Sequence, residues 1–308
     1  MRIPFTGVGT ALVTPFTSSG AVDEAGVRRL ARRQIDAGVH FLVPCGTTGE
    51  APTLSAGEKR RVVELVVAEA GGRVPVLAGA GGYDTREVVE SARAMHEAGV
   101  DGLLSVTPYY NKPTPDGLFR HYEAIAAATP LPIVVYNVPG RTGCNVDPAT
   151  LVRLASIPHV VGVKEASGNM AQICEVLKAV GPDFLVLSGD DALALPAMAV
   201  GARGVISVAS NEAPGEMARL VEAAERNDFA AARDLLQLGR SAGADFGHEP
   251  AGRHADEEHS IRLRHVYRRR AAARGQLERV VRRERNATSP GEVIGGAQRQ
   301  HAHGDRGR

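Results

Sequence analysis

Residues 160 to 170 read VVGVKEASGNM, an apolar run of Val and Gly that stops at a lysine. Short apolar runs of this kind are typical of buried strands in a parallel sheet. A buried ammonium is costly unless it is paired or loses its proton. The chain has only four lysines against 32 arginines, so a position that needs only a positive charge would usually hold an arginine. Lys164 therefore calls for an explanation at the end of this predicted strand.

Seven similar runs recur along the chain at intervals of roughly 20 to 35 residues. They begin at residues 7, 41, 74, 102, 132, 184 and 204. The stretches between them are rich in Ala, Leu and Glu at helical spacing, for example 24 to 38 and 56 to 71. Ser55 and Glu58 form a predicted capping box at the start of the second stretch. Eight buried strands alternating with helices predict an α/β fold, the (β/α)₈ or TIM barrel.

The alternative fold is a doubly wound open sheet. Its usual sign is a Gly-rich phosphate turn after the first strand, which TPFTSSGAVD (14 to 23) does not supply. Polar or special residues instead follow nearly every predicted strand, where a barrel has its active-site face. These residues are Thr14, Thr47, Glu50, Tyr110, Tyr136, Lys164, Asp190 and Ser207. The strand ends therefore favour the barrel.

Composition limits the classes of partner and compartment. The chain has 308 residues and a net charge of +1, with 15 arginines against 9 acidic residues from Arg240 to the end. The preceding part is mildly acidic, so we expect no nucleic-acid partner. No apolar stretch is long enough for a membrane helix. Three cysteines without metal spacing favour a reducing compartment, and we predict a cytoplasmic protein that holds no metal.

The chain changes character near residue 239. We assign residues 1 to 238 to the catalytic barrel and residues 239 to 308 to an atypical, poorly ordered tail. The tail holds six of the ten histidines and is rich in Arg and Gly, with little apolar rhythm beyond one candidate helix around 261 to 285. It resembles an out-of-frame reading of a GC-rich gene, which resequencing the coding DNA would test.

Two interpretations of Lys164 remain open from the residues alone. The lysine could extend from the strand end to solvent. Alternatively, it could be a partly desolvated amine that attacks a carbonyl to form a Schiff base. An imine-forming site needs a proton relay, and hydroxyl groups follow three other strands, at Thr47, Tyr110 and Tyr136. Three of the six tyrosines in the chain, Tyr109, Tyr110 and Tyr136, fall at predicted positions on the catalytic face, and this concentration favours the Schiff base.

Six motifs, in order between about residues 5 and 235, together resemble the dihydrodipicolinate synthase family within the class I pyruvate aldolase and N-acetylneuraminate lyase superfamily. They are PCGTTGE (44 to 50), TPYYNKPTPDGLFRHY (107 to 122), YNVPGRTG (136 to 143), GVKEASG (162 to 168), SGDD (188 to 191) and GVISV (204 to 208). The resemblance implies a lyase of lysine and diaminopimelate biosynthesis. It would condense pyruvate with L-aspartate 4-semialdehyde to 4-hydroxy-tetrahydrodipicolinate, without a cofactor.

The resemblance also implies roles for single residues. Lys164 would form the imine, and Tyr136 would exchange protons with Tyr110 through Thr47. Tyr110 would reach the site from the neighbouring subunit of a tight dimer, and two such dimers would form a homotetramer. Four further residues would bind substrate. Thr48 and the backbone near Ile206 would hold pyruvate, Gly189 would line the site, and Arg141 would bind the carboxylate of the aldehyde.

Two other functions remain open: a related pyruvate-dependent aldolase that acts on a sugar acid, and a barrel inactivated by its altered C-terminus. Some members of the family are inhibited by lysine at a feedback site, and this sequence matches the residues of that site poorly. The family has polar and His side chains and an Asn-Glu pair there. This chain has Ala51, Pro52, Ala56, Lys59 and Tyr83, with only Glu87 in agreement. We therefore predict weak or absent inhibition by lysine.

Overall fold

The computed structural model describes residues 3 to 241, and it contains the eight predicted strands. They are β1 (Gly7–Ala11), β2 (Phe41–Val43), β3 (Leu77–Gly79), β4 (Gly102–Val106), β5 (Ile133–Asn137), β6 (Val160–Glu165), β7 (Leu185–Ser188) and β8 (Gly204–Ser207). All of their pairings are parallel, in the order β2-β1-β8-β7-β6-β5-β4-β3. A parallel bridge between Leu42 and Val76 joins the two ends of this order and closes the barrel. The predicted (β/α)₈ fold is confirmed.

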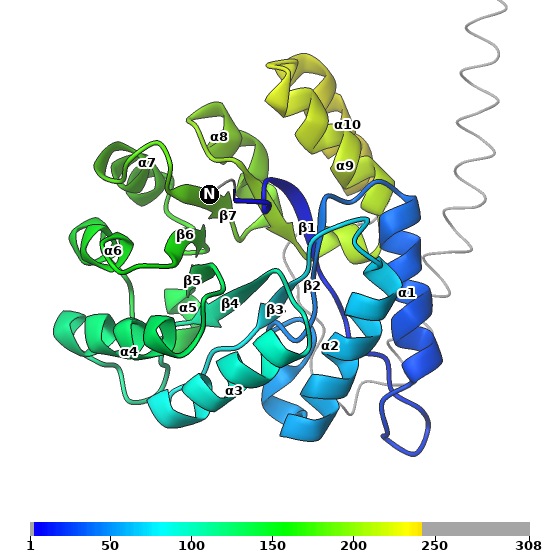
Figure 1. The fold of residues 1–308 in the computed structure, drawn as a ribbon. Coiled ribbons are helices and arrows are strands. Elements are labelled where there is room, and N and C mark those ends of the chain that lie inside the picture. Colours follow the sequence, from blue (N-terminus) through cyan, green and yellow to red (C-terminus); the bar gives the residue numbers. More distant parts are fainter. Residues whose placement is uncertain (1–2, 242–308) are drawn as a thin grey trace, which may run out of the picture. The chain divides into compact units, whose positions relative to one another are not determined.

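Helices surround the strands on the outside (Figure 1). They are α1 (Glu24–Asp36), α2 (Ala56–Ala70), α3 (Thr85–Glu97), α4 (Pro115–Ala128), α6 (Pro148–Ala155), α7 (Met170–Ala179), α8 (Ala194–Ala199), α9 (Pro214–Glu225) and α10 (Phe229–Ser241). A one-turn helix, α5 (Pro139–Thr142), follows β5. Six of these helices begin at a side chain that accepts a backbone N–H, as N-caps do. The predicted capping box of Ser55 and Glu58 is present at the start of α2.

The apolar core has two layers, as expected for a barrel whose strands are buried on both faces. Inside the barrel, a smaller cluster includes Phe5, Phe41, Leu77, Leu104 and Leu187. A larger cluster lies between the strands and the helices. Successive residues of a strand therefore point alternately into these two layers.

The register between β5 and β6 contains one irregularity. Ile133 pairs with Val160, but the next residue, Val134, pairs with Gly162, so β6 holds one extra residue at this point. Such a bulge reverses the alternation of the strand beyond it. Beyond the bulge, Lys164 pairs with Tyr136, whose side chain belongs to the inner cluster. The bulge therefore directs Lys164 toward the barrel interior.

Within the described residues, no helix has the length and apolar character needed to cross a membrane. Helix α10 extends to Ser241, so the predicted boundary at residue 238 falls within its last turn. The rest of the predicted tail, including the candidate helix around 261 to 285, lies outside the described residues.

Candidate active site

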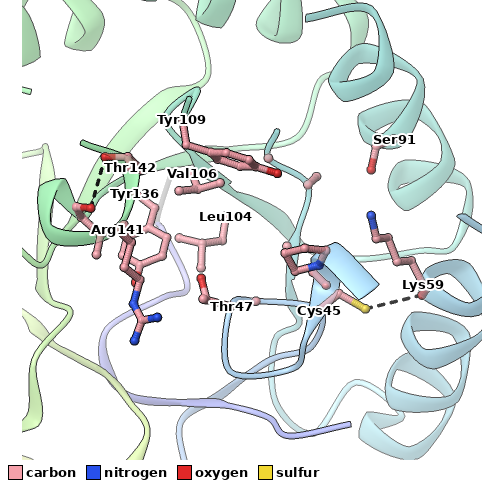
Figure 2. A pocket seen from close by; sticks show the side chains of 17 residues that line it. Cys45, Thr47, Lys59, Ser91, Leu104, Val106, Tyr109, Tyr136, Arg141 and Thr142 are labelled. Carbon is pink, nitrogen blue, oxygen red and sulfur yellow. Dashed lines mark hydrogen bonds between the residues drawn. The ribbon is translucent and has the colours of Figure 1, made fainter. Parts of the chain in front are cut away.

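A cavity of about 260 Å³ opens beside the carboxyl ends of strands β2 to β5 (Figure 2). This is the end of a (β/α)₈ barrel at which active sites lie. Four of the polar side chains around it are Thr47, Tyr109, Tyr136 and Arg141. Apolar groups such as Leu104, Val106 and Val138 form much of the remaining wall. An apolar pocket with a few converging polar groups is typical of a small-molecule site.

Lys164 and Tyr136 are buried neighbours on strands β6 and β5. Both side chains are only 4% exposed. Lys164 does not itself line the cavity, but its Nζ lies 4.1 Å from the centroid of the Tyr136 ring, which does. The two residues are direct partners in the β5–β6 register. The strand pairing therefore fixes an amine beside a phenol in a buried setting.

Gly189 leaves room for the lysine side chain. It follows β7, and its N–H donates to the carbonyl of Glu165 at 2.7 Å. A Cβ built at this position would lie 2.6 Å from the Cβ of Ala166 and 3.0 Å from Cε of Lys164. A larger residue at position 189 would therefore push against the carbon chain of the lysine.

The turn after β2 presents Thr47 toward the cavity (Figure 2). Thr48 beside it is buried. The turn is held by bonds from Gly49 N–H to the Gly46 carbonyl and from the Thr14 hydroxyl to the Gly49 carbonyl, at 3.1 and 2.7 Å. These bonds fix the backbone of the turn that carries Thr47, at the cavity, and Thr48, which is buried.

Arg141 lies on the one-turn helix α5 and its side chain is exposed. The helix is braced by the hydroxyl of Thr142, which donates to the carbonyls of Val138 and Cys144 at 3.2 and 2.9 Å. Gly143 ends the helix in a left-handed conformation at φ 68°. The guanidinium therefore stands on a braced turn at the mouth of the cavity, where it can bind a carboxylate through two hydrogen bonds.

The two adjacent tyrosines after β4 lie in different surroundings. Tyr109 lines the cavity and packs edge to face on Tyr83, with ring centroids 5.3 Å apart. Burial, with smaller contributions from Tyr83 and Glu87, raises the pKa of Tyr109. Tyr110 is 90% exposed and adopts a left-handed backbone conformation at φ 67°. In this single chain, Tyr110 therefore extends into solvent and does not reach the cavity.

Strands β7 and β8 follow β6 in the barrel and hold the other predicted site residues. Ile206 lies on β8, is buried and belongs to the inner cluster. Asp191 begins the short 3₁₀ helix after β7 (Asp191–Leu193) and accepts the N–H groups of Val208 and Ala209 at 2.9 and 2.8 Å. Burial raises the pKa of Asp191, although Ser207, these N–H groups and the charge of Lys164 act in the opposite direction. Asp191 thus connects the ends of β7 and β8 close to the lysine.

The sequence analysis missed three features of this region. It did not single out Asp191 within SGDD, and it placed Tyr109 at the catalytic face without giving it a role. It also gave no role to Glu165 or Asn137, the neighbours of Lys164 and Tyr136. Alternation along a strand could have identified the last two, because a polar residue beside an inward-facing one must lie in the layer of the helices.

Comparison with known proteins gives a consistent result. The model of the dihydrodipicolinate synthetase family matches residues 4–238. The 4-hydroxy-tetrahydrodipicolinate synthase of Koribacter versatilis (strain Ellin345) is 54% identical over 230 residues, which are 74% of this chain and 77% of that protein. The crystal structure of dihydrodipicolinate synthase from Aquifex aeolicus has 44% identity and a TM-score of 0.75, covering 77% of this chain and 81% of its own.

A further solved structure is the chloride-inhibited dihydrodipicolinate synthase of Acinetobacter baumannii, complexed with pyruvate. It has 37% identity and a TM-score of 0.77, and the match covers 86% of this chain and 98% of that one. The family match, the relatives and the barrel with its buried lysine all agree: this chain belongs to the dihydrodipicolinate synthetase family.

Proposed function

We propose that this chain is a 4-hydroxy-tetrahydrodipicolinate synthase, which condenses pyruvate with L-aspartate 4-semialdehyde. The observation that carries the proposal is the buried Nζ of Lys164, 4.1 Å from the ring centroid of Tyr136 at the carboxyl end of the barrel. The identity of the relatives supports the choice of substrates. No contact in the described part of the chain specifically favours either alternative, a sugar-acid substrate or an inactive barrel.

The proposed chemistry begins with attack of the Lys164 amine on the keto carbon of pyruvate. The C–N bond forms first, and the carbinolamine then loses its hydroxyl as water to give an imine. The departing hydroxyl needs a proton, and we assign its donation to the phenol of Tyr136, whose ring lies beside the amine. Thr47, on the same cavity wall, would pass protons onward. Because the lysine supplies the electrophilic activation, the reaction needs no further cofactor.

Other residues of the site would bind the substrates. Thr48 and the backbone at Ile206 are assigned to pyruvate, in line with their burial at the ends of β2 and β8. Arg141, at the cavity mouth, is assigned to the carboxylate of the aldehyde, because a guanidinium pairs with a carboxylate bidentately. Gly189 has a spatial role beside Lys164.

We further propose that the site is completed by a second copy of the chain. Tyr110 is too exposed to act in its own cavity, and an exposed aromatic side chain is typical of an interface. A tight dimer would insert Tyr110 into the neighbouring site, and two such dimers would make the homotetramer. The barrel assigned to residues 1 to 238 and a cytoplasmic location are parts of the same proposal.

Borohydride trapping tests the chemistry directly. Incubation of the full chain with pyruvate and sodium borohydride should add one reduced pyruvyl group at Lys164, measured by mass spectrometry of the intact chain and its peptides. Lys164→Ala should remove the mass gain and lower synthase activity by at least about 1,000-fold, as loss of a nucleophile does. Lys178→Ala, on α7, is the matched control and should still be trapped. Absence of pyruvate-dependent mass gain in the unmodified chain would reject the imine.

A further inference from the structure

Behind the reacting pair lies a second pair of residues in the same register. Asn137 follows Tyr136, Glu165 follows Lys164, and the two are partners across β5 and β6. Both are buried, with Glu165 only 2% exposed. Nδ2 of Asn137 donates to the two carboxylate oxygens of Glu165 at 3.3 and 3.0 Å. The side chains of Tyr136 and Lys164 thus point into the barrel, whereas those of Asn137 and Glu165 join the two strands on the opposite face.

The carboxylate of Glu165 also connects to the loop that follows its own strand. It accepts the N–H of Ser167 at 2.8 Å and Nε2 of Gln172 at 3.4 Å. Gln172 lies in the first turn of α7. All of these donors are neutral, and a buried carboxylate is costly unless its oxygens are well bonded. So many donors directed at one carboxylate hold it in a single position.

The same cluster reaches the segment that follows the Arg141 helix. Oδ1 of Asn137 accepts the N–H of Val146 at 3.0 Å. Asn145 exchanges hydrogen bonds with Gln172 at 2.8 and 3.2 Å, and it accepts from Asn137 at 2.9 Å. The segment after α5 is therefore tied to β5, and through Gln172 to β6 and α7.

We propose that Glu165 is a positioning residue for the reaction. Its carboxylate fixes the end of β6 against β5, which sets the placement of Lys164 beside Tyr136. Through Asn137 and Gln172 it also fixes the segment behind Arg141. The inference rests on the proposed function, because it concerns the imine-forming lysine and the aldehyde-binding arginine. A displacement of about 1 Å in such a site can cost about 100-fold in rate.

The test compares Glu165→Gln with the unmodified chain. The amide keeps the shape of the side chain but turns one acceptor oxygen into a donor that faces the donors of Asn137 and Gln172. We expect the rate of borohydride trapping at saturating pyruvate to fall at least about tenfold, while the final mass gain still reaches one group per chain. KM for the aldehyde should rise in the same variant.

A reciprocal variant distinguishes positioning from simple loss of stability. Asn137→Asp combined with Glu165→Gln exchanges the amide and the carboxylate, so that a donor again faces an acceptor, and it should restore most of the lost rate. Asn137→Asp alone sets two carboxylates against each other and should be impaired. Leu65→Ala, a buried substitution on α2 remote from the site, should lower the Tm and leave the trapping rate unchanged.

The outcomes separate the two proposals. If the unmodified chain is not trapped by pyruvate, the proposed function fails. If it is trapped, and Glu165→Gln is trapped at the same rate with only a lower Tm, the positioning role fails alone. Should Glu165→Gln not fold, Gln172→Ala removes one donor and the link to Asn145. That variant should raise KM for the aldehyde, and unchanged kinetics would overturn the inference.

Discussion

The inner part and the rim of the site are built differently. The inner part consists of Lys164, Tyr136 and Ile206, which lie on strands and are buried. The rim consists of Thr47, Arg141 and Tyr110, which lie on turns or a one-turn helix after the strands. The contrast is greatest between Lys164, 4% exposed, and Tyr110, 90% exposed. Neighbouring strands determine the inner part, whereas the rim depends on loops and, in our proposal, on a second chain.

This difference separates two requirements for activity. Parallel pairing already places the amine and the phenol within one chain. Binding of the aldehyde and the last proton transfer would depend on the rim. Imine formation and overall turnover should therefore respond differently to substitutions in the two regions, and the following predictions test that separation.

Among substitutions that leave Lys164 and Tyr136 in place, the largest effect is expected at the rim, from Tyr110→Phe. Loss of one hydroxyl in a proton relay typically costs about 100-fold or more in rate, so kcat should fall by about that factor. Imine formation should suffer less than turnover, because Lys164 and Tyr136 are untouched. Steady-state kinetics and borohydride trapping of the same preparation measure the two quantities.

Mixing variants sharpens this prediction. When Tyr110→Phe and Lys164→Ala chains exchange subunits, a mixed dimer would contain one site with a native lysine and a native tyrosine. Activity should then rise above the sum of the separate preparations. If no rise accompanies subunit exchange that is verified by native mass spectrometry, the idea of a shared site is wrong.

A smaller effect is expected in the inner part, from Gly189→Ala. The new methyl group would lie 2.6 Å from the Cβ of Ala166 and press on the chain of Lys164, which costs about 1–3 kcal/mol of stability when a packed site must shift. The trapping rate should fall about tenfold, while KM for the aldehyde changes little. Gly57→Ala, on α2 with open space around the new methyl, should leave both quantities unchanged. Equal behaviour of the two variants would contradict the tight placement of Lys164.

The smallest effect is expected from added lysine. Ala51, Pro52 and Lys59 line the cavity, where a bound lysine would meet apolar surface and a like charge. We expect less than a twofold loss of activity at about 1 mM free lysine, measured in a coupled assay, because like charges weaken binding. Half-inhibition at a lower concentration would show that the rim holds a functional lysine site.

Much of the fold could be predicted because its signals are local. Apolar runs at regular intervals identify the eight strands, and Ser55 with Glu58 marks the start of α2. Because the strands are parallel, residues at their carboxyl ends must gather at one end of the barrel. This is why Lys164 and Tyr136 could be placed together before the structure was known.

The remaining features depend on pairings that the sequence does not reveal. Nothing in VVGVKEAS indicates that the strand gains an extra residue against β5 near Val161. The hydrogen bonds of Glu165 join residues from 2 to 28 positions away along the chain, and periodicity gives no information about such partners. Likewise, the opposite surroundings of Tyr109 and Tyr110 arise from a left-handed turn at the second tyrosine.

The extra residue in β6 has a consequence for how this strand tolerates deletions and insertions. Removing Val161 would restore simple alternation and leave Gly162 opposite Val134 and Lys164 opposite Tyr136, so the amine would still point into the barrel. Adding one more residue to the same stretch would require a second bulge, because without one the amine would point toward the helices. We therefore expect β6 to tolerate the loss of one residue here better than the gain of one.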